Sequence, residues 1–362
     1  MFERPLITVT VFALLSALGC ESATRAADAG ANDPDATPDA TARPDAGPPL
    51  PNAVDVLFVI DNSGSMQEEQ NSLANNFFGF VNALEAAAGE RPSLHLGVIS
   101  TDFGAGPFGI QSCSGSGDDG VLQGAPNGAC TPPDGSFIID EIDGADRVIN
   151  YPEGQLSETF ACIARLGTDG CGFEQPLEAT RRALDGTRAQ NDGFVRDGAL
   201  LAIIYISDED DCSASDPSLY DPDSASVGPL SSFRCFRQGV ACEPDDDSLG
   251  PRSSCEPRED SDYMVPVSEY IDFLYSKKPP ERIVVAGIIG NSAPVSVALD
   301  NQGNPGLEPS CVSASGEAAP PIRLHAVLDA FPGRNVASTI CNEDLTDALL
   351  VVAGLIADNL PE

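Results

Sequence analysis

The 362-residue sequence has no tryptophan, only two histidines and few basic residues. Its 19 lysines and arginines stand against 56 acidic residues, so the formal net charge is -37. This charge repels nucleic-acid phosphates and anionic lipid head groups, which argues against both as partners. His95 and His325 lie far apart in apolar stretches, so a catalytic or zinc-binding histidine pair is not expected. Abundant carboxylates instead suit divalent cations.

Common enzyme signatures are also missing. The sequence contains no Gly-x-Ser-x-Gly elbow, no Walker-type phosphate loop and no His-Glu-x-x-His motif. The prediction is therefore a protein that is not an enzyme. A metal-dependent hydrolase that works with carboxylates and a bound water remains the minor alternative.

The N-terminus has the pattern of an export signal. Arg4 precedes an apolar run over residues 6–18, which is too short to span a membrane but fits a signal peptide over residues 1–19. The run ends in Ala-Leu-Gly-Cys, which resembles a bacterial lipobox and implies a lipid on Cys20. The alternative is an ordinary signal peptide with an unmodified Cys20. Lipidation would make the chain an exported lipoprotein of the cell envelope, at the outer membrane or cell surface.

Residues 20–51 are rich in Ala, Asp, Pro and Thr and have almost no apolar bulk, so they predict a disordered tether. Beyond Cys20 there are ten cysteines, an even number that favours a disulfide framework in an oxidising compartment. Sequence alone does not fix the pairing. Cys113 with Cys130 and Cys162 with Cys171 are guesses from proximity along the chain.

Apolar strands alternate with helical patterns over residues 52–362. This order predicts a doubly wound α/β fold with a mostly parallel sheet flanked by helices. Two cysteine-rich, Gly- and Pro-rich insertions interrupt it at about 103–155 and 209–263, and a smaller loop covers 291–320. The expected strands are 54–60, 94–100, 199–207 and 282–289, and the expected helices are 66–88, 176–184, 267–276 and 344–359.

The informative motif is Asp-Asn-Ser-Gly-Ser, which begins at Asp61 directly after the first strand. Asp61, Ser63 and Ser65 occupy alternate positions of one turn and can face a single ion, and such oxygen ligands select Mg²⁺, Ca²⁺ or Mn²⁺. The alternative is a helix N-cap. Asp208 ends a second apolar strand, and ligands of open α/β sheets bind at that edge. A loop containing Glu174 opens the helix between them.

This series of segments resembles the von Willebrand factor type A domain, over roughly 52–360. The resemblance implies a metal-ion-dependent adhesion site, with Mg²⁺ as the first choice of cation. Ser63 and Ser65 would bind the ion directly, Asp61 and Asp208 would hold its waters, and an acidic side chain of a partner would complete the shell. The family carries Thr in the middle loop, and Glu174 is preferred over Gln175 at that position.

Three further points follow from the same segments. Asp102 is either a neighbour of the ion's ligands or a turn residue before Gly104. Residues 209–211 form either a second ion site or, preferably, a solvated acidic loop. The function predicted is a cell-surface lipoprotein that captures a protein or other ligand through the cation. The alternative is a structural scaffold of an envelope complex, stabilised by metal and disulfides.

Overall fold

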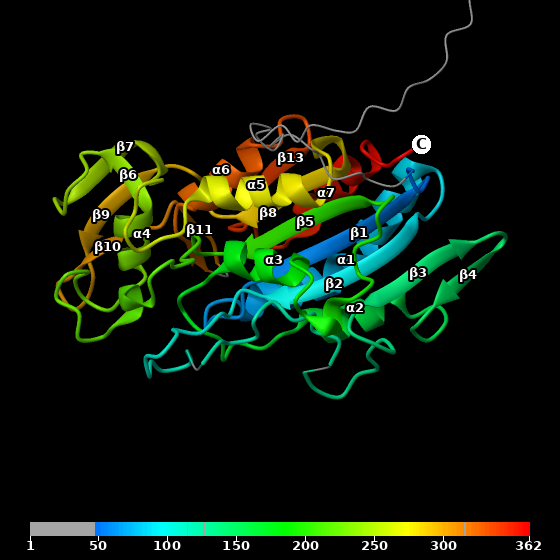
Figure 1. Ribbon diagram of the computed structural model, residues 1–362, viewed down its shortest axis with the longest axis horizontal. Helices are drawn as coiled ribbons and strands as arrows, with labels where there is room; N and C mark the ends of the chain where they lie inside the picture. Colours follow the sequence, from blue (N-terminus) through cyan, green and yellow to red (C-terminus); the bar gives the residue numbers. More distant parts are fainter. Residues whose placement is uncertain (1–47, 114, 126, 315) are drawn as a thin grey trace, which may run out of the picture. The chain divides into compact units, whose positions relative to one another are not determined.

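A seven-stranded sheet forms the centre of the computed structural model, which describes residues 48–113, 115–125, 127–314 and 316–362. The strand order is β13-β8-β5-β1-β2-β3-β4, and the first five of these are parallel (Figure 1). The strands are β1 (Ala53–Ile60), β2 (Ser93–Ser100), β3 (Ile138–Asp143), β4 (Asp146–Ile149), β5 (Leu200–Ser207), β8 (Ile283–Ile289) and β13 (Asn335–Thr339). The inner strands are β-branched runs buried on both faces, as parallel sheets require.

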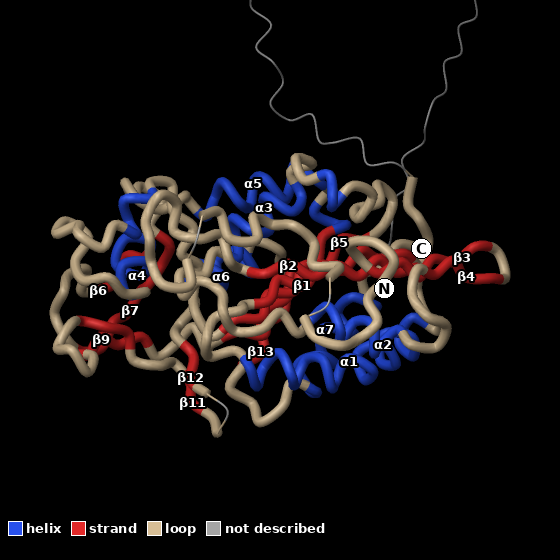
Figure 2. The backbone as a smooth tube through the Cα atoms, turned by 90° about the horizontal axis from the view of Figure 1, so that it is seen from below, coloured by secondary structure: helices blue, strands red, loops and turns tan. Residues whose placement is uncertain are grey.

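Helices cover both faces of this sheet (Figure 2). One face carries α1 (Gln67–Ala88), α2 (Leu156–Ala164) and α7 (Thr346–Ala357), and the other carries α3 (Pro176–Leu184), α5 (Val267–Lys277) and α6 (Ile322–Asp329). Phe58 of β1 lies under a cluster of three phenylalanines from α1 and α2, in which the rings of Phe77 and Phe160 stack at 3.6 Å. The predicted doubly wound α/β class is confirmed.

The regions predicted as irregular insertions contain regular structure. The first contributes the antiparallel hairpin β3–β4, which extends the sheet beyond β2. The second and third build a separate antiparallel sheet in the order β10-β9-β7-β6. Its elements, and those of the adjacent hairpin, are α4 (Phe233–Gly239), β6 (Val240–Glu243), β7 (Gly250–Pro257), β9 (Val295–Leu299), β10 (Pro305–Leu307), β11 (Cys311–Val312) and β12 (Glu317–Ala318).

Five disulfides pin these insertions and use all ten cysteines beyond Cys20: Cys113–Cys171, Cys130–Cys162, Cys212–Cys235, Cys242–Cys255 and Cys311–Cys341. The predicted framework is confirmed, but the guessed pairs 113–130 and 162–171 are wrong. Cys162 lies on α2 and meets Cys130, whereas Cys171 lies in the loop before α3 and meets Cys113. The position of α2 in the fold, rather than distance along the chain, sets the pairing.

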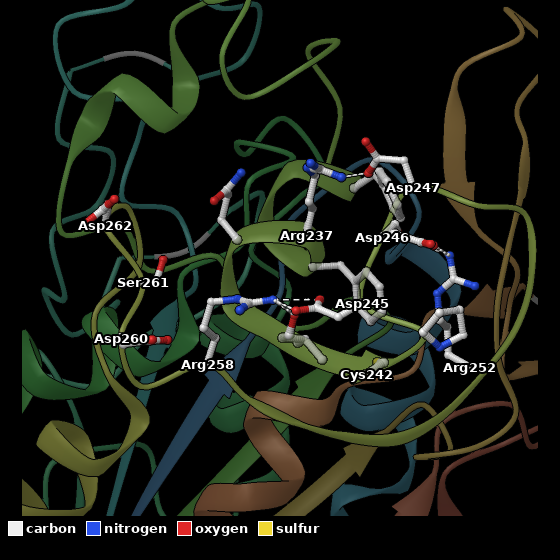
Figure 3. Close-up of a pocket in the computed structure, with 15 residues that line it drawn as sticks. Arg237, Cys242, Asp245, Asp246, Asp247, Arg252, Arg258, Asp260, Ser261 and Asp262 are labelled. Carbon is white, nitrogen blue, oxygen red and sulfur yellow. Dashed lines mark hydrogen bonds and ion pairs between the residues drawn. The ribbon is translucent and has the colours of Figure 1, made fainter.

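Ion pairs hold the outer loop of the second insertion. Three arginines line a cleft of about 340 Å³, and each is paired with one of three consecutive aspartates (Figure 3). The guanidinium of Arg258 contacts both oxygens of Asp245 at 2.7 and 2.8 Å. Arg237 pairs with Asp247, and Arg252 lies 3.9 Å from Asp246. The three aspartates neutralise these arginines, so the ion pairs in this cleft stabilise the conformation of the loop.

The predicted signal peptide (1–19), Cys20 and most of the predicted tether (20–51) lie outside the described residues. Within the part of the chain that the structure describes, no helix combines the length and apolarity required to cross a bilayer.

Candidate metal centre

The strand register brings three chain segments to one point at the carboxyl edge of the sheet. Ile60 of β1 pairs with Ser100 of β2 and with Ile206 of β5, and all three strands run parallel. The residues that follow, Asp61, Thr101 and Ser207, therefore lie side by side at the centre of the sheet. Backbone bonds fix this edge, since the amide of Asp61 donates to the carbonyl of Ile206 at 2.9 Å.

Asp61 is fully buried and organises the turn after β1. Its Oδ1 accepts a hydrogen bond from the amide of Ser63 at 2.8 Å, and its Oδ2 accepts one from the hydroxyl of Ser207 at 2.7 Å. The hydroxyls of Ser63 and Ser65 lie 3.1 Å apart. The N-cap interpretation of this motif is wrong, because α1 begins after Met66 and has no side-chain cap.

Asp208 and Glu174 each bring a carboxylate oxygen that lacks a protein partner. Oδ1 of Asp208 and Oε1 of Glu174 are buried without a hydrogen bond. The other oxygen of Glu174 accepts a hydrogen bond from the hydroxyl of Thr101. A buried polar atom left unsatisfied costs about 1–3 kcal/mol, and more when it is charged. Both oxygens would be satisfied by a bound cation or its waters.

The buried carboxylates repel one another. Burial raises the pKa of Asp61 to about 7, and the charge of Asp208 adds to this rise. Burial raises the pKa of Glu209 to about 8, again with contributions from Asp61 and Asp208. Burial also places the pKa of Glu174 well above its usual range and raises that of Asp208, against a hydrogen bond from Ser65. Among the described residues, no lysine, arginine or histidine forms an ion pair with any of these four carboxyl groups, so no basic side chain stabilises their charged forms.

A divalent cation fits this donor set only if hydroxyls take part. Among the described residues, no three His, Cys, Asp or Glu side chains are placed to hold an ion by themselves. The hydroxyls of Ser63 and Ser65 would supply the remaining ligands beside the carboxylates. A set made only of oxygen atoms suits a hard ion such as Mg²⁺, Ca²⁺ or Mn²⁺.

Two predicted residues near the centre hold the loop after β2, and the charge of one of them, Asp102, also contributes to raising the pKa of Glu174. The amide nitrogen of the Gln175 side chain donates to the carbonyl of Gly104 at 2.9 Å. Oδ1 of Asp102 accepts from the amide of Gly104 at 2.8 Å, which is the turn geometry. Of the two residues considered for the middle loop, Glu174 is the one whose carboxylate accepts a hydrogen bond from Thr101, and burial, together with the charge of Asp61, raises its pKa.

The preferred interpretation of residues 209–211 as a solvated loop is wrong for Asp210 and Asp211. Asp210 accepts hydrogen bonds from the amides of Arg323 and Leu324 and so caps the N-terminus of α6. Asp211 is 1% exposed, accepts from the amide of Leu177 at the start of α3, and forms a buried ion pair with Arg323 at 3.0 Å. Both carboxylates have structural partners and are not available for a second ion.

Sequence reasoning missed three residues of this centre, Thr101, Ser207 and Gln70, and named Glu209 only as part of the acidic run 209–211. Gln70 lies on the buried face of α1, and its side-chain nitrogen donates to the carbonyls of Asp61 and Gly167, both at 2.9 Å. A glutamine among the apolar residues of an inward face was the available signal. Thr101 and Ser207 could have been found as hydroxyl residues that end neighbouring strands.

Fold and site together define a doubly wound α/β domain with an oxygen-lined centre at its carboxyl edge. No protein-family model and no curated protein matches the sequence. The chain is similar in structure to a von Willebrand factor type A protein from Catenulispora acidiphila (8% identity, TM-score 0.34, covering 84% of this chain and 42% of that one).

Two pilus adhesins are also similar to the chain. SpaC from Lactobacillus rhamnosus GG has 11% identity and a TM-score of 0.37, with 85% of this chain and 31% of that one covered. RrgA from Streptococcus pneumoniae has 9% identity and a TM-score of 0.36, with 88% and 45% covered. The chain thus spans less than half of each of these three structures.

Proposed function

We propose that this chain is a binding protein, not an enzyme, which captures a partner through a divalent cation held at the carboxyl edge of its sheet. The observation that supports this is the convergence of Asp61, Ser63, Ser65, Glu174 and Asp208, with buried carboxylates that have no basic counter-charge. Four acidic groups in one place destabilise a protein unless a cation compensates them.

The contacts suggest how the ligands divide their roles. Both oxygens of Asp61 already accept hydrogen bonds, which suits a residue that orients the turn and the waters of the ion. The hydroxyls of Ser63 and Ser65 now contact each other at 3.1 Å and would turn toward a bound ion, and Ser65 is exposed at the surface. A coordination position on the Ser65 side would be open to a ligand from solution. Mg²⁺ is the cation proposed, with Ca²⁺ or Mn²⁺ as alternatives.

The proposed location is the cell envelope, where a lipid on Cys20 would tether the domain at the outer membrane or cell surface. The apolar segment 6–18 before Cys20 supports export. Five disulfides also support it, because such bonds persist in oxidising compartments.

The test is calorimetric titration of the metal-free protein with Mn²⁺ and Mg²⁺, using the wild type, Asp208→Asn and Asp143→Asn. Asp143 is exposed on the β3–β4 hairpin, so its variant removes one negative charge away from the centre. We expect one site whose affinity falls at least about tenfold in Asp208→Asn and stays unchanged in Asp143→Asn. Equal affinity in all three proteins would contradict the proposal.

A structural scaffold and a hydrolase make different predictions. For a scaffold, chelation lowers the melting temperature but changes no interaction of the protein. For a hydrolase, a test ester or phosphoester is turned over, and turnover is lost in Asp208→Asn. For the binding protein, the ion exchanges freely with solution and keeps an exchangeable water, which is measurable by water-proton relaxation with bound Mn²⁺.

A further inference from the structure

A cleft of about 550 Å³ opens beside the candidate metal centre, with Ser65 and Asp208 at one end. Its size falls in the range of small-molecule sites, about 300–1,000 Å³. The insertions build the rest of its wall, through the start of α4, strand β10 and the β11–β12 hairpin. Helix α4 belongs to the second insertion, and β10 and the β11–β12 hairpin belong to the smaller third one.

The charged side chains that line the cleft all carry the same sign. They are the carboxylates Asp208, Glu209, Asp210, Asp300 and Glu317, and no Lys, Arg or His is among the lining residues. Asp210 caps the N-terminus of α6, and Asp300 accepts hydrogen bonds from the backbone amides of Gln302 and Asn304 in its own turn. Glu317 is exposed, and its charge contributes to raising the pKa of Asp208. A ligand in this cleft therefore meets hydrogen-bond acceptors with negative charge.

The remaining wall is apolar and aromatic. Phe233 is partly exposed and stacks on Phe236, with ring centroids 5.8 Å apart and an interplanar angle of 27°. Leu307 of β10 adds an aliphatic surface, and the hydroxyl of Ser232 is exposed at the same wall. An aromatic face beside acceptors is suited to a ligand with both C–H surfaces and polar hydrogens.

A ligand that carries hydroxyl groups satisfies both ends of the cleft. A cation at Ser63 and Ser65 requires a lone pair from the ligand, whereas the carboxylate wall requires hydrogen-bond donors. A carboxylate offers only the first, and it adds negative charge beside four acidic groups. An ammonium group offers only the second, and the cation repels it. A hydroxyl group accepts and donates at once.

We propose that the cleft binds a neutral saccharide, with vicinal hydroxyls on the cation and on the acidic wall and a ring face on Phe233. This inference rests on the proposed function, because the cation supplies one anchor. The proposed ligand differs from the one that the family resemblance implies, which is an acidic side chain of a partner. The acidic wall of the cleft would repel such a carboxylate.

The test is an array of neutral glycans, sialylated and uronic-acid glycans, Asp-containing peptides and Lys-rich peptides, probed with the oxidised protein. Binding is measured in Ca²⁺, in Mg²⁺ and in EDTA. We expect retention of neutral glycans that depends on the divalent cation. Phe233→Ala should weaken that retention about five- to tenfold through loss of the stacking surface. Glu317→Gln should weaken it as well, because a charged acceptor becomes neutral.

The matched control is Leu249→Ala, since Leu249 is 53% exposed in the same insertion and does not line the cleft. It should bind glycans as the wild type does, and Leu249→Ala and Phe233→Ala should both bind Mn²⁺ with unchanged affinity. Stronger retention of acidic glycans, of either peptide class, or retention that survives EDTA would overturn the proposal. So would a protein that binds Mn²⁺ but retains no neutral glycan. Loss of Mn²⁺ binding in the wild type would instead refute the metal centre itself.

Discussion

Replacing Asp61 by Asn should stabilise the protein in the absence of metal at alkaline pH. Asp61 is fully buried, and burial with the neighbouring Asp208 raises its pKa from 3.8 to about 7. The folded state therefore holds a proton that the unfolded state releases near pH 4. Stability falls as the pH rises through this window, by roughly 4 kcal/mol for this group alone. Asn keeps the acceptor for the Ser63 amide and carries no charge.

A bound cation should reverse the ranking of the two proteins. At pH 8 the wild type gains about 2.7 kcal/mol at a cation concentration of 100 times the dissociation constant. Asp61→Asn should gain little, because the charge that favours the ion is gone. At pH 4 in EDTA the two proteins should differ by less than about 1 kcal/mol, since the carboxyl is then protonated in the folded state and only about half ionised in the unfolded state.

The assay is urea denaturation between pH 4 and pH 8.5, in EDTA and in MgCl₂, with disulfides intact. Circular dichroism is the appropriate signal, because the chain has no tryptophan. Asp143→Asn controls for the general effect of one charge on a chain with net charge -37. The reasoning is refuted if Asp61→Asn is less stable than wild type at pH 8 in EDTA, or if both respond equally to Mg²⁺.

Three further substitutions test separate parts of the account. Ser65→Ala should weaken Mn²⁺ binding about tenfold by calorimetry while leaving the melting temperature in EDTA unchanged, because this side chain is exposed. Arg323→Met leaves Asp211 buried without its counter-charge and should lower the free energy of unfolding by about 3–5 kcal/mol in urea; adding Asp211→Asn should recover part of this loss. Phe160→Ala should cost about 3–5 kcal/mol in the same assay, because its ring stacks on Phe77 in the core, and a loss below about 1 kcal/mol would contradict that packing.

The core elements could be predicted from the sequence because their burial follows simple periodicity. The strand expected at 54–60 is Ala53–Ile60, and the helix expected at 66–88 is Gln67–Ala88. Each carries one clear pattern, an unbroken apolar run in the strand and helical spacing of apolar residues in the helix, although β5 and α7, which pack against them, lie far away in the chain. The helix at Pro176–Leu184 was placed correctly because proline begins it.

The second sheet was not predictable in the same way. Strand β7 pairs partly with β6 and partly with β9, more than 40 residues away, and it contains two adjacent serines and no apolar run. Helix α6 and strand β13 were also missed, since the short α6 begins after two prolines and is capped from a distant loop by Asp210. Contacts between distant segments, rather than local pattern, stabilise these elements.

Within the candidate centre, the motif beginning at Asp61 and the strand ending before Asp208 could be found because each follows an apolar run. The roles of Asp210 and Asp211 could not, because four consecutive acidic residues look alike in sequence. In the structure their side chains have different partners. Asp208 lies beside Ser65, Asp210 contacts the beginning of α6, and Asp211 contacts the beginning of α3.

The most direct measurement is the anomalous difference map of a crystal grown with Mn²⁺. The account predicts one strong peak at the carboxyl edge of the sheet, within about 2.0–2.3 Å of the hydroxyl oxygens of Ser63 and Ser65. Waters or carboxylate oxygens of Asp61, Glu174 and Asp208 should complete its shell. A map with no peak there, or with its only peak at the aspartates of the outer loop, would contradict the claim that this protein works through a bound cation.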